Sequence, residues 1–269
     1  MKMSTLHQLL SDLVAETAVL DDLLAGLRDD EWETATPAEG WAVRDQVSHL
    51  AFFDEAAVVA ATNPERFRTD AERLKALGPN FPDVVAAGFQ ETPVSELNTW
   101  FRNARSELIA TFAKLDGKAR MPWFGPDMSV TSCVTARLME TWAHTQDVLD
   151  AFGVVRKPTM RLRHVAHLGV RTMHFSFHLN GRPAPEAPVH VSLKAPDGSV
   201  WSWGPEDSHD RVEGDALDFC LVVTQRRNVA DTGLVVSGPV ASEWLTIAQA
   251  YAGAPGPGRE PLISIRSVS

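Results

Sequence analysis

Cysteine is scarce in this sequence. Its 269 residues include only two, Cys133 and Cys220, which lie far apart along the chain. A disulfide framework is therefore not expected, and proteins that lack one are typical of reducing compartments. We therefore expect a cytoplasmic protein.

Basic residues are also in short supply. Lys and Arg number 25 against 35 Asp and Glu, which gives a formal net charge of −10. An acidic chain without a basic patch is poorly matched to a phosphate backbone or to anionic lipid headgroups. We expect neither a nucleic-acid partner nor a membrane partner.

Long apolar runs and several catalytic motifs are missing as well. No stretch of about 18 apolar residues is present to span a bilayer, and Met1–Thr5 leads into an amphipathic pattern that does not resemble a signal peptide. The sequence contains no glycine-rich phosphate loop, no CxxC pair and no G-x-S-x-G elbow. The length fits one large soluble domain or two modest ones.

Apolar residues in the first half of the chain recur at three- and four-residue steps, the period of amphipathic helices. Long helices are predicted over residues 6–27, 43–61, 93–115 and 130–152, the first with Ser4 or Thr5 as its N-cap. Four such helices with short or moderate connections favour a four-helix bundle. Residues 63–91 are expected to carry short helices, and aromatic residues in the loop 118–128 are candidates to cover a pocket.

The hydrophobic period changes after a further predicted helix over residues 159–179. Alternating residues predict strands at 189–193, 200–203, 212–214 and 234–236, and helical patterns return at 215–224 and 241–252. The fold class is therefore α + (α+β). The predicted domains are a bundle over residues 1–155, a connecting helix and linker over 156–185, and a smaller α+β domain over 186–269.

A candidate metal site combines two of the predicted helices. Glu140 and His144 are four residues apart, so about 6 Å of helical rise separates them on one face. His49 on the second helix completes a set of two histidines and one carboxylate, which leaves coordination positions open as in catalytic sites. The alternatives are a solvated polar face and a satisfied core histidine. Asp147, one turn after His144, either orients a ligand or is solvated.

Two further groups are candidates for substrate binding. His164, His167, Arg171, His174 and His178 form one stripe on the helix over residues 159–179. The stripe either binds a carboxylate or another anion, with His164, His167 and Arg171 as the proposed contacts, or is an exposed polar face.

Arg226 is the second candidate. It follows the helix predicted over residues 215–224 and either holds a carboxylate bidentately or caps that helix.

Two segments carry a resemblance to a known family. Gly40–Leu50 followed by Glu140–Asp147 resembles the DinB-like superfamily, and within it the N-terminal metal-binding domain of mycothiol-dependent maleylpyruvate isomerases. The resemblance covers roughly residues 5–153. It implies that His49, Glu140 and His144 are the metal ligands.

Residues 160–269 are similar to the C-terminal part of an uncharacterised actinobacterial group of DinB-like proteins, through segments 163–171, 217–227 and 244–250. In the isomerases this region is a small α+β domain similar to sterol-carrier proteins, and one of its arginines assists catalysis. Arg226 is the nearest candidate for that role. Residues 63–91 and the histidine stripe depart from the isomerases. Some relatives carry a wyosine-base-formation label, but the acidic charge gives a tRNA partner no support.

These observations lead to two main functional hypotheses. The first is a divalent-metal-dependent enzyme that uses mycothiol or another small thiol. It would either isomerise a small electrophile that bears a carboxylate or transfer the thiol to it. Zinc is the expected ion, with nickel and iron as alternatives; Arg226 and Asp147 are the catalytic candidates. The second is a non-catalytic metal-binding protein whose C-terminal domain binds an apolar ligand. A purely structural bundle is a third alternative, and a homodimer is compatible with all three.

Overall fold

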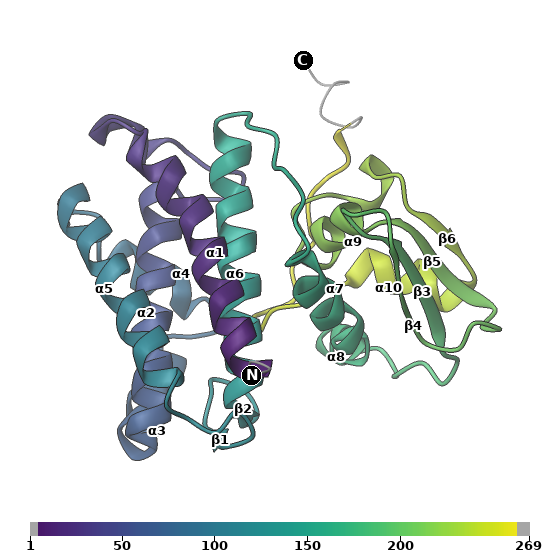
Figure 1. Ribbon diagram of the computed structural model, residues 1–269, viewed down its shortest axis with the longest axis horizontal. Coiled ribbons are helices and arrows are strands. Elements are labelled where there is room, and N and C mark those ends of the chain that lie inside the picture. Colours follow the sequence, from purple (N-terminus) through teal and green to yellow (C-terminus); the bar gives the residue numbers. More distant parts are fainter. Residues whose placement is uncertain (1–4, 263–269) are drawn as a thin grey trace. The chain divides into compact units, whose positions relative to one another are not determined.

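The computed structural model describes residues 5–262 and divides the chain into two compact units, Met1–Arg156 and Lys157–Ser269 (Figure 1). The helices of the predicted connecting segment belong to the second unit. Ser4, one of the two predicted N-cap residues, lies outside the described residues, and the first helix begins at Thr5.

Four long helices form the body of the first unit. They are α1 (Thr5–Ala25), α2 (Val43–Thr62), α5 (Val94–Phe112) and α6 (Val130–Ala151), close to the predicted ranges. Helix α6 begins where predicted because Ser129 caps it: its Oγ accepts a hydrogen bond of 3.0 Å from the Ser132 amide. Packing of α2 against both α5 and α6 brings together helices that are far apart in the sequence.

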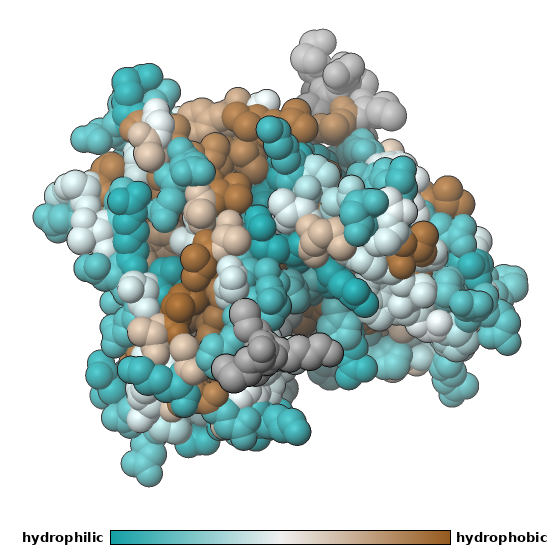
Figure 2. All heavy atoms as spheres, viewed as in Figure 1, coloured by the Kyte–Doolittle hydropathy of each residue, from teal (hydrophilic) through white to brown (hydrophobic). Residues whose placement is uncertain are grey.

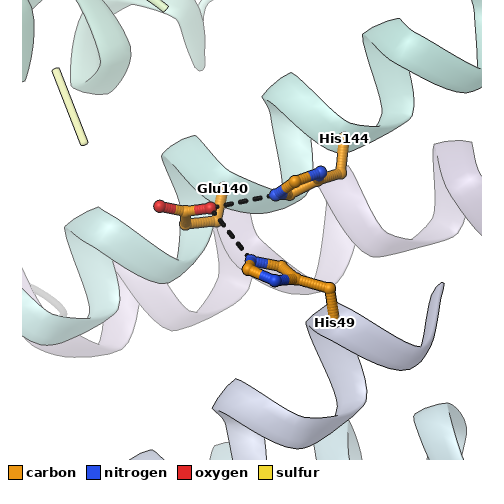
Figure 3. A group of neighbouring side chains, drawn as sticks. All are labelled: His49, Glu140 and His144. Carbon is orange, nitrogen blue, oxygen red and sulfur yellow. Dashed lines mark hydrogen bonds and ion pairs between the residues drawn. The ribbon is translucent and has the colours of Figure 1, made fainter. Parts of the chain in front are cut away.

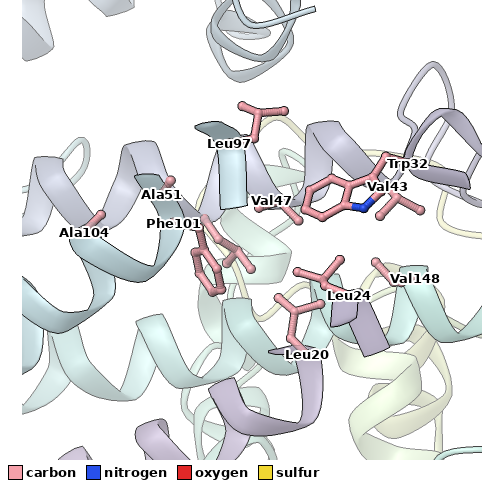
Figure 4. Packing of buried hydrophobic residues seen from close by; sticks show 11 residues of the cluster. Leu20, Leu24, Trp32, Val43, Val47, Ala51, Leu97, Phe101, Ala104 and Val148 are labelled. Carbon is pink, nitrogen blue, oxygen red and sulfur yellow. The ribbon is translucent and has the colours of Figure 1, made fainter. Parts of the chain in front are cut away.

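The apolar stripes of these helices meet in a common core (Figure 4). Leu20 of α1, Val47 of α2 and Phe101 of α5 are fully buried there. Trp32 joins them from the 3-10 helix η1 (Asp29–Glu33). Each such side chain contributes about 1.5–3 kcal/mol by its removal from water. This core holds α2 in a fixed position beside α6.

Shorter elements connect the long helices. As expected, residues 63–91 carry two short helices, α3 (Pro64–Lys75) and α4 (Phe81–Ala87). The aromatic loop is closed by an antiparallel pair of short strands, β1 (Arg120–Met121) and β2 (Met128–Ser129).

The second unit combines helices with a four-stranded sheet of order β4-β3-β5-β6, in which only β3 and β5 run parallel. Its elements in chain order are α7 (Leu162–Arg171), α8 (Met173–Leu179), β3 (Val189–Lys194), β4 (Val200–Trp203), β5 (Asp210–Asp215), α9 (Ala216–Val223), η2 (Val229–Asp231), β6 (Val235–Ser237) and α10 (Pro239–Ile247). A Cβ at Gly169 of α7 would lie 2.6 Å from the Val223 side chain of α9, so this close approach requires glycine.

Two helix predictions in this unit were wrong in their extent. The single helix expected over residues 159–179 is interrupted at Thr172, whose hydroxyl donates to the carbonyls of Leu168 and Gly169. The Thr172 backbone, with φ −93° and ψ 7°, departs from helical values at this point. The helix expected over 241–252 ends at Ile247 because the next amides bond elsewhere in the unit: Gln249 donates to the Ser176 hydroxyl.

The surface of the first unit has an apolar strip between α1 and α5, visible on the face in Figure 2 and lined by Val14, Ala18 and Ile109. Among the described residues, no helix has the combination of length and apolarity needed to cross a bilayer.

Candidate metal site

Three side chains converge between α2 and α6 (Figure 3). Oε2 of Glu140 lies 3.1 Å from Nε2 of His144, one helical turn further along α6, and 3.5 Å from Nε2 of His49 on α2. One candidate donor atom from each residue lies within 4.8 Å of the other two. The structure therefore brings together the three residues that were predicted from the sequence as metal ligands.

The donor set suits a divalent transition metal. Two imidazole nitrogens and one carboxylate oxygen are ligands that zinc, iron and nickel accept. Metal–ligand bonds of about 2.0–2.2 Å place neighbouring donor atoms roughly 3–3.6 Å apart, which is close to the separations of Glu140 from the two histidines. Three protein ligands leave at least one position for water or substrate.

A hydrogen-bond relay sets the orientation of His144. Thr36 donates its only hydroxyl hydrogen to the carbonyl of Trp41 at 2.8 Å, so its oxygen accepts from Nε2 of Gln46, also at 2.8 Å. The Gln46 amide therefore turns its Oε1 toward His144 and accepts a hydrogen bond from Nδ1 of that ring. Nδ1 keeps its hydrogen, and Nε2 is the atom that binds a proton or a metal.

Asp147 has a different position from the one expected of an orienting residue. Its Oδ2 lies 3.9 Å from Nδ1 of His144, beyond hydrogen-bond distance. Gln46 bonds that nitrogen in its place. Asp147 is buried, so the solvated alternative is excluded as well.

His49 lies in an apolar aromatic environment. Its ring centroid is 4.5 Å from that of Phe53 and 5.2 Å from that of Trp41, which also stacks against His144 at 5.8 Å. Burial, with a contribution from the nearby His144, lowers the pKa of His49 to about 4. Its Nδ1 is buried without a hydrogen-bond partner among the described residues. His49 is therefore a neutral ring at physiological pH, as a metal ligand must be.

Glu140 is held in its charged form. Desolvation opposes ionisation, but hydrogen bonds from the rings of His144 and His49 outweigh it and hold the pKa of Glu140 well below its usual value. A carboxylate that stays ionised between two histidines supplies the negative charge that a divalent ion requires.

A buried ionic cluster lies along the same helices. Asp54 of α2 is fully buried and accepts hydrogen bonds from Nε of Arg105 at 2.6 Å and from Nε of Arg137 at 3.0 Å. Arg105 also donates to Thr141 at 3.0 Å. Nη2 of Arg137 is buried without a hydrogen-bond partner among the described residues, and its guanidinium lies 5.9 Å from the Phe53 ring. The cluster fixes the α2–α6 pairing on which the metal site depends.

The remaining candidates lie in the second unit. Of the histidine stripe, His164 is half-buried, and His167, Arg171, His174 and His178 are exposed, which agrees with the polar-face alternative. His167 accepts a hydrogen bond of 3.2 Å from Trp203, and its pKa is lowered by partial burial and by the charges of Arg171 and His164.

Arg226 is half-buried and donates to the Thr224 carbonyl at the end of α9 at 2.7 Å, a capping contact.

Cys133 is a buried residue of the first unit. The side chain is fully buried on α6, and burial raises the pKa of its thiol to about 12. A thiol that stays protonated at neutral pH is neither a metal ligand nor a nucleophile.

Sequence reasoning missed Thr36, Trp41 and Gln46. Trp41 and Gln46 lie inside the segment that carried the family resemblance, so their proximity to His49 was available as a signal. Gln46 is three residues before His49 and lies on a neighbouring part of the same helix surface. Thr36 precedes α2 in an irregular link, and no periodicity marks it.

The chain is similar to known proteins over most of its length. Residues 13–149 match the family described as the mycothiol maleylpyruvate isomerase N-terminal domain. An uncharacterized protein of Mycobacterium tuberculosis, found in two strains, is 45% identical over 252 residues, which cover 93% of this chain and 97% of that protein. The chain belongs to the DinB-like, maleylpyruvate isomerase-like family.

Solved structures show the fold that the family shares. The crystal structure of the mycothiol-dependent maleylpyruvate isomerase superposes with a TM-score of 0.58 at 15% identity, over 89% of this chain and 99% of that one. A single-residue variant of that isomerase superposes with a TM-score of 0.59 at 14% identity and the same coverage. Residues 185–236 also match a family described as wyosine base formation.

Proposed function

We propose that this protein is a divalent-metal-dependent enzyme that uses a small thiol, mycothiol or a close equivalent, to isomerise or thiolate an electrophilic substrate. The observation that carries the proposal is the convergence of His49, Glu140 and His144, with Nδ1 of His144 engaged by Gln46 so that Nε2 faces the other two donors. Membership of a family that includes a mycothiol-dependent isomerase supports the choice of thiol.

In this proposal His49, Glu140 and His144 hold the ion, and zinc is the expected one. A divalent ion bound there supplies Lewis-acid chemistry that favours the thiolate form of a coordinated thiol. Gln46 keeps the hydrogen of His144 on Nδ1 throughout. Trp41 and Phe53 cover the His49 ring and limit the access of water to it.

The roles of the second-unit residues are also proposals. Arg226, or the stripe residues His164, His167 and Arg171, would bind a substrate carboxylate, and the sheet-containing unit would be sterol-carrier-like. Asp147 would act on the site electrostatically, since its carboxylate lies 3.9 Å from Nδ1 of His144. The predicted cytoplasmic location suits a reaction that needs a reduced thiol.

The test is thiol-dependent turnover of an electrophile by the metal-loaded protein. We expect His144→Ala to lose activity while circular dichroism shows an unchanged fold. His178→Ala, which removes an exposed histidine of the second unit, serves as the matched control and should stay active. Equal turnover in His144→Ala would reject the proposal. A protein that binds metal, turns over no thiol and co-purifies with a lipid would favour the carrier alternative.

A further inference from the structure

A second candidate binding site lies in the first unit, between α2 and α3. It is a pocket of about 320 Å³. Ligand sites of small molecules begin near this volume. Most of its walls are apolar, and they include Phe52, Ala56, Phe67, Leu74 and Phe124.

An unbroken series of aromatic contacts connects this α2–α3 pocket with the metal site. The His49 ring contacts Phe53, with centroids 4.5 Å apart, and Phe53 contacts Phe124 at 5.4 Å. Phe124 belongs to the loop between β1 and β2 and forms part of the pocket wall, where it also meets Phe67 of α3 at 5.1 Å. Phe52, which forms part of the pocket wall, is three residues after His49, so about one helical turn of α2 separates the pocket from this candidate ligand.

Charges at the pocket disfavour an anionic occupant. Glu55 and Asp70 both line it, against the single cation of Arg73. Arg73 is itself paired with Asp70 at 3.8 Å, and Glu55 accepts a hydrogen bond of 2.7 Å from Trp100. A free carboxylate or phosphate would meet like charge and lose hydration without a matching donor. An uncharged apolar group would bury its surface against the aromatic walls.

We propose that the α2–α3 pocket binds an uncharged aromatic or branched apolar group, and, on the basis of the proposed function, that this group is part of the electrophilic substrate. The substrate would then differ from a small dicarboxylate such as maleylpyruvate. Its reactive carbon would lie toward the metal site and its apolar portion between α2 and α3.

Binding is tested by fluorescence titration of the full-length protein with the neutral dye N-phenyl-1-naphthylamine. The Ala56→Phe variant places a ring inside the pocket, and we expect dye affinity at least about tenfold weaker because the cavity is filled. Leu74→Trp fills the same space from α3 and guards against a folding defect in the first variant. Ala76→Phe, at an exposed position outside the pocket, is the matched control and should bind dye as the wild type does.

The dye result is independent of catalysis, so His144→Ala should keep wild-type dye affinity. Equal dye affinity in the wild type and in both filled variants would overturn the pocket proposal, as would equal weakening in Ala76→Phe.

The substrate assignment is tested by comparing an aryl-bearing neutral electrophile with a small carboxylate-bearing one. In Ala56→Phe, kcat/KM should fall about tenfold for the aryl compound only, which corresponds to 1.4 kcal/mol. An equal loss for both compounds would contradict the assignment. Absence of thiol chemistry in the wild type, with dye binding intact, would reject the proposed function and leave the pocket standing.

Discussion

Gln46 is the residue that decides which nitrogen of His144 faces the other two donors. Its amide has one oxygen and one NH₂ group, and the Thr36 hydroxyl can only accept from it because its own hydrogen is bonded to the Trp41 carbonyl. The side chain is fully buried, so no water competes for Oε1. Support of this kind for a metal-ligating histidine affects both ring orientation and basicity.

The Gln46→Ala variant tests that role. Loss of the acceptor for Nδ1 frees the His144 ring, and we expect zinc affinity to fall by about 10- to 100-fold, as measured by competition with a chromophoric chelator. Gln46→Glu keeps an acceptor oxygen and should retain most of the affinity. A decrease of the same size in both variants would show that Gln46 acts through packing alone.

Protonation of His49 provides a second test at this scale. Its pKa is about 4 in the folded protein against an ordinary 6.5, so between these values the unfolded chain binds the proton more strongly. The free energy of unfolding of the metal-free protein should therefore decrease as the pH falls below 6.5, by up to about 1.4 kcal/mol per pH unit. Glu140 also has a depressed pKa, but its contribution is lost only below its ordinary value of 4.5.

Between pH 6.5 and 4.5, the pH dependence of the free energy of unfolding therefore contains the contribution of His49 and not that of Glu140. Urea unfolding at several pH values measures the slope, and His49→Gln should show a smaller slope in this window. An identical pH dependence in the wild type and in His49→Gln would refute the account of the buried ring.

The pairing of α2 with α6 is the structural element on which the site depends. Asp54 of α2 accepts hydrogen bonds from Arg137 of α6 and from Arg105 of α5. Both arginines are almost completely buried. Removal of the shared carboxylate charge leaves two guanidinium groups without their counter-ion in a low-dielectric environment. Such a loss is far more costly than the loss of a surface ion pair.

The Asp54→Asn substitution should therefore destabilise the protein by about 3–5 kcal/mol, as measured by chemical denaturation. Asp70→Asn breaks exposed pairs with Arg66 and Arg73 on α3 and should cost less than about 1 kcal/mol. Comparable losses in the two variants would contradict a structural role for the buried cluster.

The bounds of helices could be predicted well from the sequence where a periodic hydrophobic pattern extends over many residues. The four long helices of the first unit lie close to their predicted bounds because apolar residues recur on one face of each. The early end of α10 was not predictable, since it involves a hydrogen bond to Ser176, which is far away in the sequence. No change of hydrophobic period marks the break at Thr172. The buried cluster was also missed, because Asp54 and Arg137 are far apart in sequence and are ordinary surface residues by type.

For the whole molecule, the candidate ligands were accessible from the sequence because two signals coincided. The Glu140–His144 spacing alone describes a common helical pair, and His49 alone describes a common core histidine. Their combination became informative through the family resemblance, and the structure brings the three together. The hydrogen bonds that join Thr36, Gln46 and His144 could not be predicted from the sequence, because they depend on the path of the irregular link before α2.

The second unit contains the four-stranded sheet and the histidine stripe. The roles proposed for them, in binding an apolar ligand and a substrate carboxylate, stay predictions. The α2–α3 pocket lies in the first unit and is lined by residues of α2, of α3 and of the loop between β1 and β2. The candidate metal site and the α2–α3 pocket both lie in the first unit, so both proposals can be tested with variants of that unit.

The measurement that tests the central claim most directly is the metal content of the purified, zinc-supplied protein after extensive dialysis, by inductively coupled plasma mass spectrometry. The account predicts about one zinc ion per chain in the wild type and in His178→Ala, and a small fraction of that in His144→Ala and in His49→Ala. No retained zinc in the wild type, or equal zinc in all four proteins, would contradict a metal site at His49, Glu140 and His144.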